Sequence, residues 1–226
     1  MRRVIAIDGP AASGKSSTAA LVAQRLGWAH LDSGALYRAV TLAALDAFAS
    51  LPTSGQRFVG LAEELPVRLV LVGNSFRPEV AGVDVERAIR SQRVTARVSA
   101  VAAIPEVRAW VNARQREAVD EHPSGVVVDG RDIGTVVFLD APLKIFLTAT
   151  SEERARRRLS QRGEPPETTG VQQESRVLEA RDQADTTRAV APLKAAADAV
   201  LLDSTRLSLD EQVELVTKLA RERFAG

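Results

Sequence analysis

The stretch GPAASGKS at residues 9–16 constrains this chain more than any other feature. It satisfies G-x-x-x-x-G-K-[ST], the pattern of a phosphate-binding loop. An apolar run at residues 4–7 precedes it, and residues 17–26 behind it place alanines and leucines at helical spacing. Strand, glycine loop and helix in this order form the context that the motif requires. The stretch therefore predicts binding of a nucleoside triphosphate, in preference to a glycine-rich turn with a chance lysine.

Each part of this loop contributes to holding phosphate. Successive backbone N–H groups point into one concavity, and the helix N-terminus adds a partial positive charge. Lys15 can reach the β- and γ-phosphates, and the hydroxyl of Ser16 can ligate Mg²⁺. We expect the triphosphate and its Mg²⁺ to be bound by Gly9, Pro10, Ala11, Ala12, Ser13, Gly14, Lys15, Ser16 and Ser17.

Composition excludes several other kinds of site. The 226 residues suit one sizeable domain and contain no cysteine, which rules out disulfides, thiolate zinc sites and a cysteine nucleophile. His30 and His122 are the only histidines, too few for a histidine metal cluster. A net charge of +1 with 4% aromatic residues favours neither nucleic acid nor an anionic membrane as partner. We expect a cytoplasmic protein, because the first strand leaves no room for a signal peptide and no apolar run approaches about 20 residues.

Hydrophobic runs alternate with helical patterns along the chain. Five runs read as core strands, at residues 4–7, 28–31, 126–128, 143–147 and 199–202. This alternation predicts a doubly wound α/β/α sandwich of three layers around a five-stranded parallel sheet. Residues 67–72 and 77–85 break the alternation and read as antiparallel strands of an insertion, after a loop at 51–60 and a short helix at 61–65.

Two polar segments follow predicted strands, where ligands of parallel sheets bind. Residues 32–38, DSGALYR, place Arg38 in the first turn of a helix, where it opposes the helix dipole and needs a salt bridge or an anionic ligand. Residues 129–132, DGRD, form either a tight turn or a chemical site.

Arginines gather on two later helices. The first, capped by Thr150 or Ser151, bears a run of arginines that is usually a solvated face. The second begins near residue 171, after a polar and mobile-looking segment at 163–170, and places Arg181, Asp185 and Arg188 on one face. If that face borders the phosphates, it supplies cations near the transferring group.

Four segments together resemble the bacterial cytidylate kinases, over essentially the full length: IDGP with GK at 7–15, LDSGALYR at 31–38, DGRDIGTVVF at 129–138 and RAVAPL at 188–193. The resemblance implies a nucleoside monophosphate kinase fold. Its parts would be a core (residues 1–35, 104–150 and 189–226), a monophosphate-binding insert with a small antiparallel sheet (about 36–103) and a lid (about 151–188).

The resemblance also implies a reaction, the transfer of the γ-phosphoryl group of MgATP to CMP or dCMP. We expect the protein to be a monomer. Residues implied for the acceptor are Ser33, Tyr37, Arg38, Ser99, Arg108, Asp129, Arg131, Asp132, Arg181, Asp185 and Arg188. Those implied for neutralising the transferring group are Lys15, Arg131, Arg188, Arg154 and Arg158.

Cytosine recognition follows from donor and acceptor chemistry at the implied residues. The exocyclic amine of cytosine can donate to Asp132 or Ser99, and its N3 and O2 suit Arg108. Uracil reverses the donor pattern at that edge and would be the poorer substrate. No general base is required, because the acceptor phosphate is already ionised.

The match has gaps, and other functions stay open. Ala184 stands where some relatives have a charged residue, and residues 163–170 match no motif. The alternatives are another small phosphate-loop kinase, acting on uridylate, shikimate or dephospho-coenzyme A, and a regulatory module that hydrolyses nucleotide slowly. Arginines on two inserts are superfluous for the latter.

Overall fold

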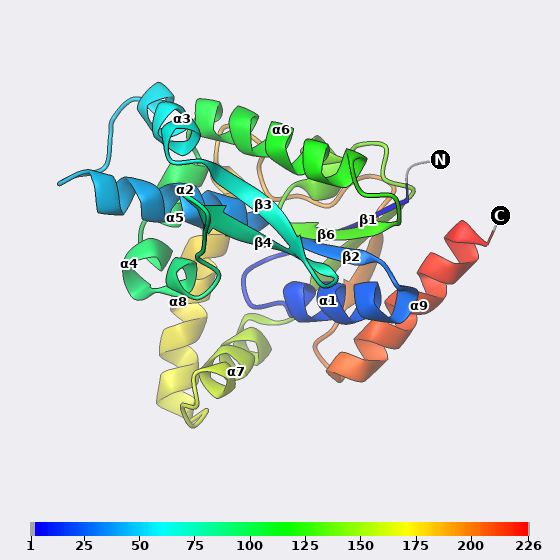
Figure 1. Ribbon diagram of the computed structural model, residues 1–226. Helices are drawn as coiled ribbons and strands as arrows, with labels where there is room; N and C mark the ends of the chain where they lie inside the picture. Colours follow the sequence, from blue (N-terminus) through cyan, green and yellow to red (C-terminus); the bar gives the residue numbers. More distant parts are fainter. Residues whose placement is uncertain (1–2, 226) are drawn as a thin grey trace.

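The computed structural model describes residues 3–225, and its elements are arranged around one mixed sheet (Figure 1). The strand order is β3-β4-β2-β6-β1-β7-β8, with β5 paired to β4. The five predicted core strands are present and run parallel to one another: β1 (Val4–Asp8), β2 (Ala29–Asp32), β6 (Val126–Gly130), β7 (Leu143–Thr148) and β8 (Val200–Asp203). The predicted fold class is confirmed.

The antiparallel strands near residues 67–85 are continuous with this sheet and do not form a separate one. β3 (Val67–Val72) pairs antiparallel with β4 (Ser75–Val80), and β4 pairs parallel with β2 through Ser75 and Phe76. The predicted strand at 77–85 is interrupted, because Ala81 (φ 50°) and Gly82 (φ 79°) turn the chain back into β5 (Val83–Asp84).

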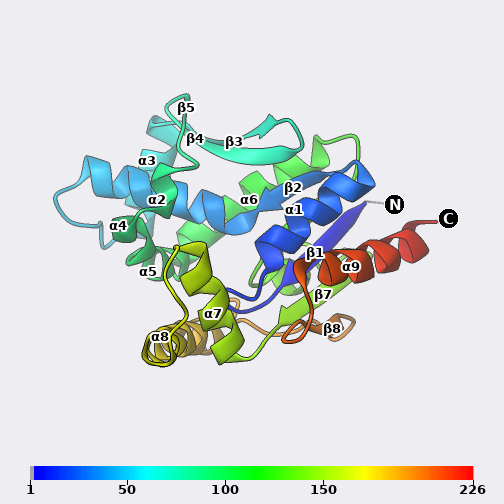
Figure 2. The ribbon, with the colours of Figure 1, turned by 90° about the horizontal axis from the view of Figure 1, so that it is seen from below.

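Helices cover both faces of the sheet, which explains why the central strands are apolar throughout. α1 (Lys15–Leu26) and α9 (Leu209–Phe224) lie on one face, and α6 (Pro105–Asp120) lies on the other (Figures 1 and 2). Alternate residues of β1 enter the two cores, so that Ile5 packs toward α1 and α9 while Val4 packs in the cluster that contains Val119 of α6.

The segment between β2 and α6 forms a third apolar core around α2 (Ser33–Ala47). The other helices of this segment are α3 (Gly55–Glu64), η1 (Ala88–Arg90), α4 (Gln92–Thr95) and α5 (Val98–Ala102). The expected loop at 51–60 is wrong in its second half, since α3 begins at Gly55. A Cβ at this glycine would lie 2.6 Å from Ile104 Cγ2, so it serves close packing against the segment that leads into α6.

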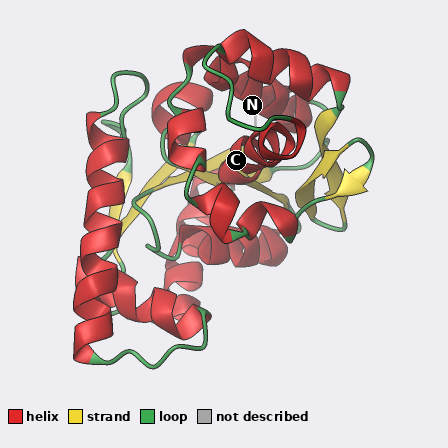
Figure 3. Cartoon of the chain, turned by 90° about the vertical axis from the view of Figure 1, so that its left-hand side faces the viewer, coloured by secondary structure: helices red, strands yellow, loops and turns green. Residues whose placement is uncertain are grey.

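Two helices project from the body as a hairpin (Figures 1 and 3). α7 (Ser151–Gln161) is capped by Thr150, whose side chain accepts the N–H of Glu153 at 3.4 Å. α8 (Thr168–Thr187) begins three residues before the predicted position and follows a short loop. A π-helical turn, η2 (Ile133–Val137), follows β6 and was not predicted.

Strand register brings acidic side chains to one edge of the sheet. Asp8 at the end of β1 pairs with Gly130 of β6, and Asp32 at the end of β2 pairs with Asp129. The carboxylate of Asp8 accepts the N–H groups of Ile133 and Gly134, both at 2.8 Å. Asp8 therefore ties the start of the phosphate loop to η2.

Gly125→Ala should destabilise the fold through overpacking. A Cβ at Gly125 would lie 2.2 Å from the ring of Trp28, which is itself held edge-on by Phe224 with ring centroids 5.0 Å apart. We expect the free energy of unfolding in urea to fall by roughly 1–3 kcal/mol. Gly60→Ala is the matched control, since nothing lies within 4 Å of its added Cβ in α3, and it should be neutral or stabilising. Equal effects of the two variants would contradict the packing argument.

Asp8 should make stability depend on pH. Burial raises the pKa of this carboxyl from 3.8 to about 6, against the lowering effect of its two backbone hydrogen bonds. The folded state then binds the proton more tightly than the unfolded state. The resulting stabilisation is complete below pH 3.8 and is lost as the pH rises through about 6, by about 3 kcal/mol.

Urea unfolding across pH 4–7 measures this contribution of Asp8 to the free energy of unfolding. The proteins compared are the wild type, Asp8→Asn and the exposed control Glu214→Gln. Asp8→Asn should show a flatter decline of stability over that range, and Glu214→Gln should follow the wild type. Parallel curves for all three proteins would rule out the effect.

Candidate active site

A cavity of about 330 Å³ opens where the carboxyl ends of β2 and β6 meet the phosphate loop. α2, α5 and α6 line it on one side, and α7 and α8 line it on the other. Most of the predicted site residues meet there: Ala11, Ala12, Gly14, Lys15, Ser16, Ser17, Ser33, Tyr37, Arg38, Ser99, Arg108, Asp129, Arg131, Asp132, Arg158, Arg181, Asp185 and Arg188.

Four predicted residues do not line the cavity. Gly9 lets the loop pass β7, because a Cβ there would lie 2.1 Å from the carbonyl oxygen of Leu147. Pro10 turns its carbonyl oxygen to Lys15 Nζ at 3.1 Å. Ser13, within the loop, is fully buried, and the Arg154 side chain donates to backbone carbonyl oxygens.

The sequence reasoning missed several residues that line the cavity: Asp32, Gly34, Arg90, Val98, Ala102, Gly130 and Gln161. Asp32 has the ordinary role of a helix cap, since its carboxylate accepts the N–H of Gly34 at 2.9 Å, and a cap gives no signal of a binding site. Arg90 carried no local signal, because η1 has three residues and its place beside Asp32, at 3.4 Å, depends on the tertiary fold.

Two residues in the left-handed region shape the phosphate loop, Ala12 (φ 57°) and Gly14 (φ 91°). Gly14 is the residue directly before α1. Lys15 is buried under the loop. Burial, with the charge of Arg131 as the next cause, lowers the pKa of Lys15 to about 7. A bound phosphate would oppose both effects by placing negative charge beside the ammonium.

Beside the loop, Ser16 Oγ donates to Asp129 Oδ2 at 2.6 Å, and His30 Nε2 lies 2.8 Å from the other carboxylate oxygen. Burial alone would lower the pKa of His30, but the hydrogen bond and the charge of Asp129 raise it. Oxygen donors of this kind at a phosphate site fit Mg²⁺, which takes one or two protein ligands and completes its shell with water and phosphate. Within residues 3–225, no group of three or more acidic or histidine side chains could hold a metal by itself.

The end of the cavity beside α5 and α6 contains a buried ion pair. Arg108 Nη2 contacts Asp132 Oδ2, and Arg108 Nη1 donates to the carbonyl oxygen of Ala102 at 3.0 Å. The Arg108 guanidinium carbon also lies 5.5 Å from the ring centroid of Tyr37. Arg108 Nε is a buried donor for which the described residues provide no acceptor.

Positive charge dominates the space between this ion pair and the phosphate loop. Arg131 Nε donates to Asp185 Oδ2 at 2.9 Å, and Arg188 Nη2 lies 3.5 Å from Asp132 Oδ1. Burial, with Arg131 as the next cause, lowers the pKa of Arg181 to about 10. Eight lysines and arginines line the cavity against four aspartates, so its field favours an anion carrying several charges.

Arg38 raised the question of whether a salt bridge or a ligand balances its charge. Its Nη1 donates to two neutral acceptors, the carbonyl oxygen of Ile89 at 3.2 Å and Thr95 Oγ1 at 3.0 Å. No ion pair to Arg38 occurs among the residues that the structure describes. The arrangement favours an anionic ligand.

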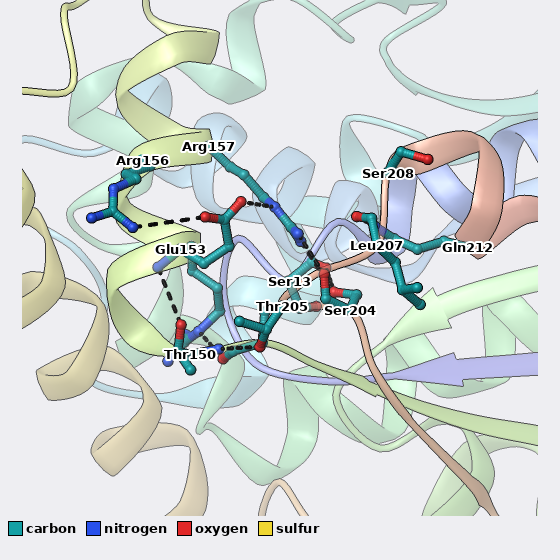
Figure 4. Close-up of polar contacts among 12 residues, drawn as sticks. Ser13, Thr150, Glu153, Arg156, Arg157, Ser204, Thr205, Leu207, Ser208 and Gln212 are labelled. Carbon is teal, nitrogen blue, oxygen red and sulfur yellow. Dashed lines mark hydrogen bonds and ion pairs between the residues drawn. The ribbon is translucent and has the colours of Figure 1, made fainter.

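The arginines of α7 have different surroundings. Arg158 lines the cavity and pairs with Glu174 at 3.3 Å. Arg157 is held by Glu153 and donates to Ser204, at 2.6 Å to the carbonyl oxygen and 3.1 Å to Oγ (Figure 4). Ser204 Oγ donates to the carbonyl oxygen of Ser13 at 3.4 Å, so Arg157 of α7 is connected to the phosphate loop through Ser204.

Arg154, which is predicted to neutralise the transferring group, does not line the cavity. Its guanidinium donates to the carbonyl oxygens of Ala149 and Ala11, at 3.1 Å and 2.9 Å, and to Asp182 at 2.5 Å. With these partners and with only 6% of its surface exposed, Arg154 serves to hold segments together.

Comparison with known proteins agrees with the geometry. A family profile described as cytidylate kinase matches residues 5–222. A cytidylate kinase of Azotobacter vinelandii is 46% identical over 99% of this chain and 97% of that protein, and one of Stutzerimonas stutzeri is 48% identical over the same shares. A solved structure of an uncharacterised protein from Eubacterium ventriosum aligns with a TM-score of 0.52 at 11% identity, over 96% of this chain and 97% of that one, and supports the fold alone. No helix within residues 3–225 is long and apolar enough to cross a bilayer. The extent of these matches shows that the chain belongs to the cytidylate kinase family and is a nucleotide kinase.

Proposed function

We propose that this protein transfers the γ-phosphoryl group of MgATP to CMP or dCMP, giving CDP or dCDP. The observation that carries the proposal is the buried Arg108–Asp132 pair at one end of a cavity whose other end is the phosphate loop. A base bound at the pair and a triphosphate bound at the loop place their phosphates among the arginines between them. The two cytidylate kinases named above support the same acceptor.

The donor binds through the loop and its helix. Backbone N–H groups and the N-terminus of α1 face the phosphates, and Lys15 supplies a charge at the β/γ junction. Ser16, oriented by Asp129, would hold Mg²⁺. When bound, the ion neutralises charge on the β- and γ-oxygens.

The acceptor base is recognised by three residues. Asp132 or Ser99 accepts the exocyclic amine, and the unsatisfied Arg108 Nε donates to the ring edge. Uracil would place its carbonyl oxygen against the Asp132 carboxylate, so uridylate should react poorly.

The acceptor phosphate and sugar bind to the arginine cluster. Arg38, Arg131 and Arg188 hold the phosphate through charge-assisted hydrogen bonds. Asp185 accepts hydrogen bonds from the sugar hydroxyls, with Arg181 beside it. Asp129 orients Ser16, and Asp185 orients Arg131. Their negative charges also reduce the repulsion among the arginines of the cavity.

Transfer then requires positioning and charge stabilisation. An acceptor phosphate oxygen attacks the γ-phosphorus, and the bond from phosphorus to the β–γ bridging oxygen breaks, so that ADP leaves. Lys15, Arg131, Arg158 and Arg188 surround the transferring group and neutralise its equatorial oxygens. α7 and α8 cover the cavity and exclude water, which would otherwise accept the phosphoryl group.

A coupled assay of ADP formation tests the proposal. MgATP is supplied with CMP, dCMP, UMP, AMP or shikimate, and Lys15→Ala is the control. Turnover with CMP and dCMP well above UMP is the expected result, and Lys15→Ala should lose activity with every acceptor. A protein that binds ATP but shows no acceptor-dependent turnover would refute the kinase assignment, and steady hydrolysis without acceptor would instead indicate a regulatory module.

Asp132→Asn should change base selectivity. Arg108 requires an oxygen at the side chain of residue 132, so the new amide nitrogen turns toward Arg188 and the cavity. A donor then faces the exocyclic amine of cytosine. We expect kcat/KM for CMP to fall by about ten-fold or more, with a smaller loss for UMP.

The measurement is kcat/KM for both acceptors, with urea unfolding as a check that the variant is folded. Equal losses for CMP and UMP in a folded variant would place base discrimination elsewhere.

A further inference from the structure

A carboxylate of α8 reaches the phosphate loop. Asp182 Oδ1 accepts the backbone N–H of Ala11 at 3.0 Å, and Asp182 Oδ2 accepts Arg154 Nη1 at 2.5 Å. The two residues that it joins are 171 and 28 positions away in the chain. One side chain thus connects α8 both to the loop and to α7.

Arg154 completes this contact, and we call Ala11, Arg154 and Asp182 together the junction. Its Nη1 also donates to the carbonyl oxygen of Ala11 at 2.9 Å, and its Nε donates to the carbonyl oxygen of Ala149 at 3.1 Å. Both polar backbone groups of Ala11 are therefore bonded to the ion pair. The side chains of Arg154 and Asp182 are 7% and 17% exposed, so solvent screening is weak here, unlike at the surface pairs of α7.

The junction lies next to residues of the active-site cavity on both of its sides. Along the loop, Ala11 precedes Ala12, a non-glycine residue in the left-handed region (φ 57°) that its surroundings must hold in place. Along α8, Asp182 lies between Arg181 and Asp185, which both line the cavity. The position of residue 182 therefore sets where these two side chains lie relative to the loop.

We propose that Asp182 is a positioning residue that clamps α8 to the phosphate loop. Through its bonds to Ala11 and Arg154, it sets α7, α8 and the loop in one arrangement, in which the donor phosphates meet the acceptor-facing side chains of α8. The structural part of this inference stands on geometry alone. Its kinetic part rests on the proposed function.

A distance measurement tests the structural part without any substrate. The chain has no cysteine, so Gln24→Cys on α1 and Gln172→Cys on α8, both exposed, can carry a pair of spin labels. Double electron–electron resonance should give a narrow distribution of distances between the two labels in the otherwise unchanged protein. Asp182→Asn should broaden it or shift it to longer distances, while Glu179→Gln, which removes a charge from an exposed position of the same helix, should not. Identical distributions for Asp182→Asn and the parent would overturn the clamp.

Steady-state kinetics test the positioning role. Asp182→Asn should lower kcat with MgATP and CMP by about ten-fold or more, because a hydrogen bond to a charged group is lost. The dissociation constant for ATP should change by less than about three-fold, since the other loop N–H groups and Lys15 remain. A residue that only stabilises the fold would lower the unfolding midpoint and leave kcat of the folded enzyme unchanged, and that result would overturn the proposal.

A double-mutant cycle assigns the effect to the junction. Arg154→Lys should resemble Asp182→Asn in kcat, and the double variant should lose less than the product of the two single losses. Independent, multiplicative effects would contradict a shared junction. If the parent enzyme phosphorylates no monophosphate, the proposed function fails, and the distance measurement still decides whether Asp182 clamps α8 to the loop.

Discussion

The site depends on the parallel pairing of β1 with β6. This register sets Asp8, the residue before the phosphate loop, opposite Gly130, in the middle of the DGRD segment. The Asp8 carboxylate then fixes the following turn through the N–H groups of Ile133 and Gly134. Because Arg131 and Asp132 lie between these anchored positions, the donor loop and the acceptor-facing residues have one fixed relation. A slip of one residue would turn every side chain of β6 to the other face of the sheet and would shift Arg131 and Asp132, which follow this strand, relative to the phosphate loop.

Uncompensated positive charge is the second organising feature. Arg38 has neutral partners, Arg181 Nε has no acceptor within residues 3–225, and burial lowers the pKa values of Arg181 and Lys15. Each of these conditions costs free energy in the folded chain. A polyphosphate ligand would remove the cost by supplying the missing negative charge, which explains why such groups converge on a cavity and not on the exposed surface.

Sequence reasoning found what depends on local pattern and missed what depends on distant contacts. The phosphate loop, the five parallel strands and the Thr150 cap follow from spacing and residue type, and the structure confirms them. The break after Val80 depends on the turn made by Ala81 and Gly82, and the start of α3 at Gly55 depends on close packing against Ile104, so the local sequence pattern revealed neither. Arg90 and His30 belong to segments without a motif, so the pairing of Arg90 with Asp32 and of His30 with Asp129 appears only in the folded structure.

The arginines of α7 show why residue type alone could not assign roles in the lid. Arg154, Arg157 and Arg158 lie within five consecutive residues of one helix, yet they reach the loop carbonyl of Ala11, Ser204 and the cavity. Residues three and four positions apart share one face of a helix, so helical periodicity groups these arginines and does not say which of them meets phosphate. For Arg154 the partner is Asp182, a half-buried carboxylate that accepts a hydrogen bond from its guanidinium. Several cations that line the cavity are less fully paired than Arg154. Arg38 and Arg181 form no ion pair within residues 3–225, and Arg108 and Arg188 share Asp132, so these side chains keep charge for an anionic ligand.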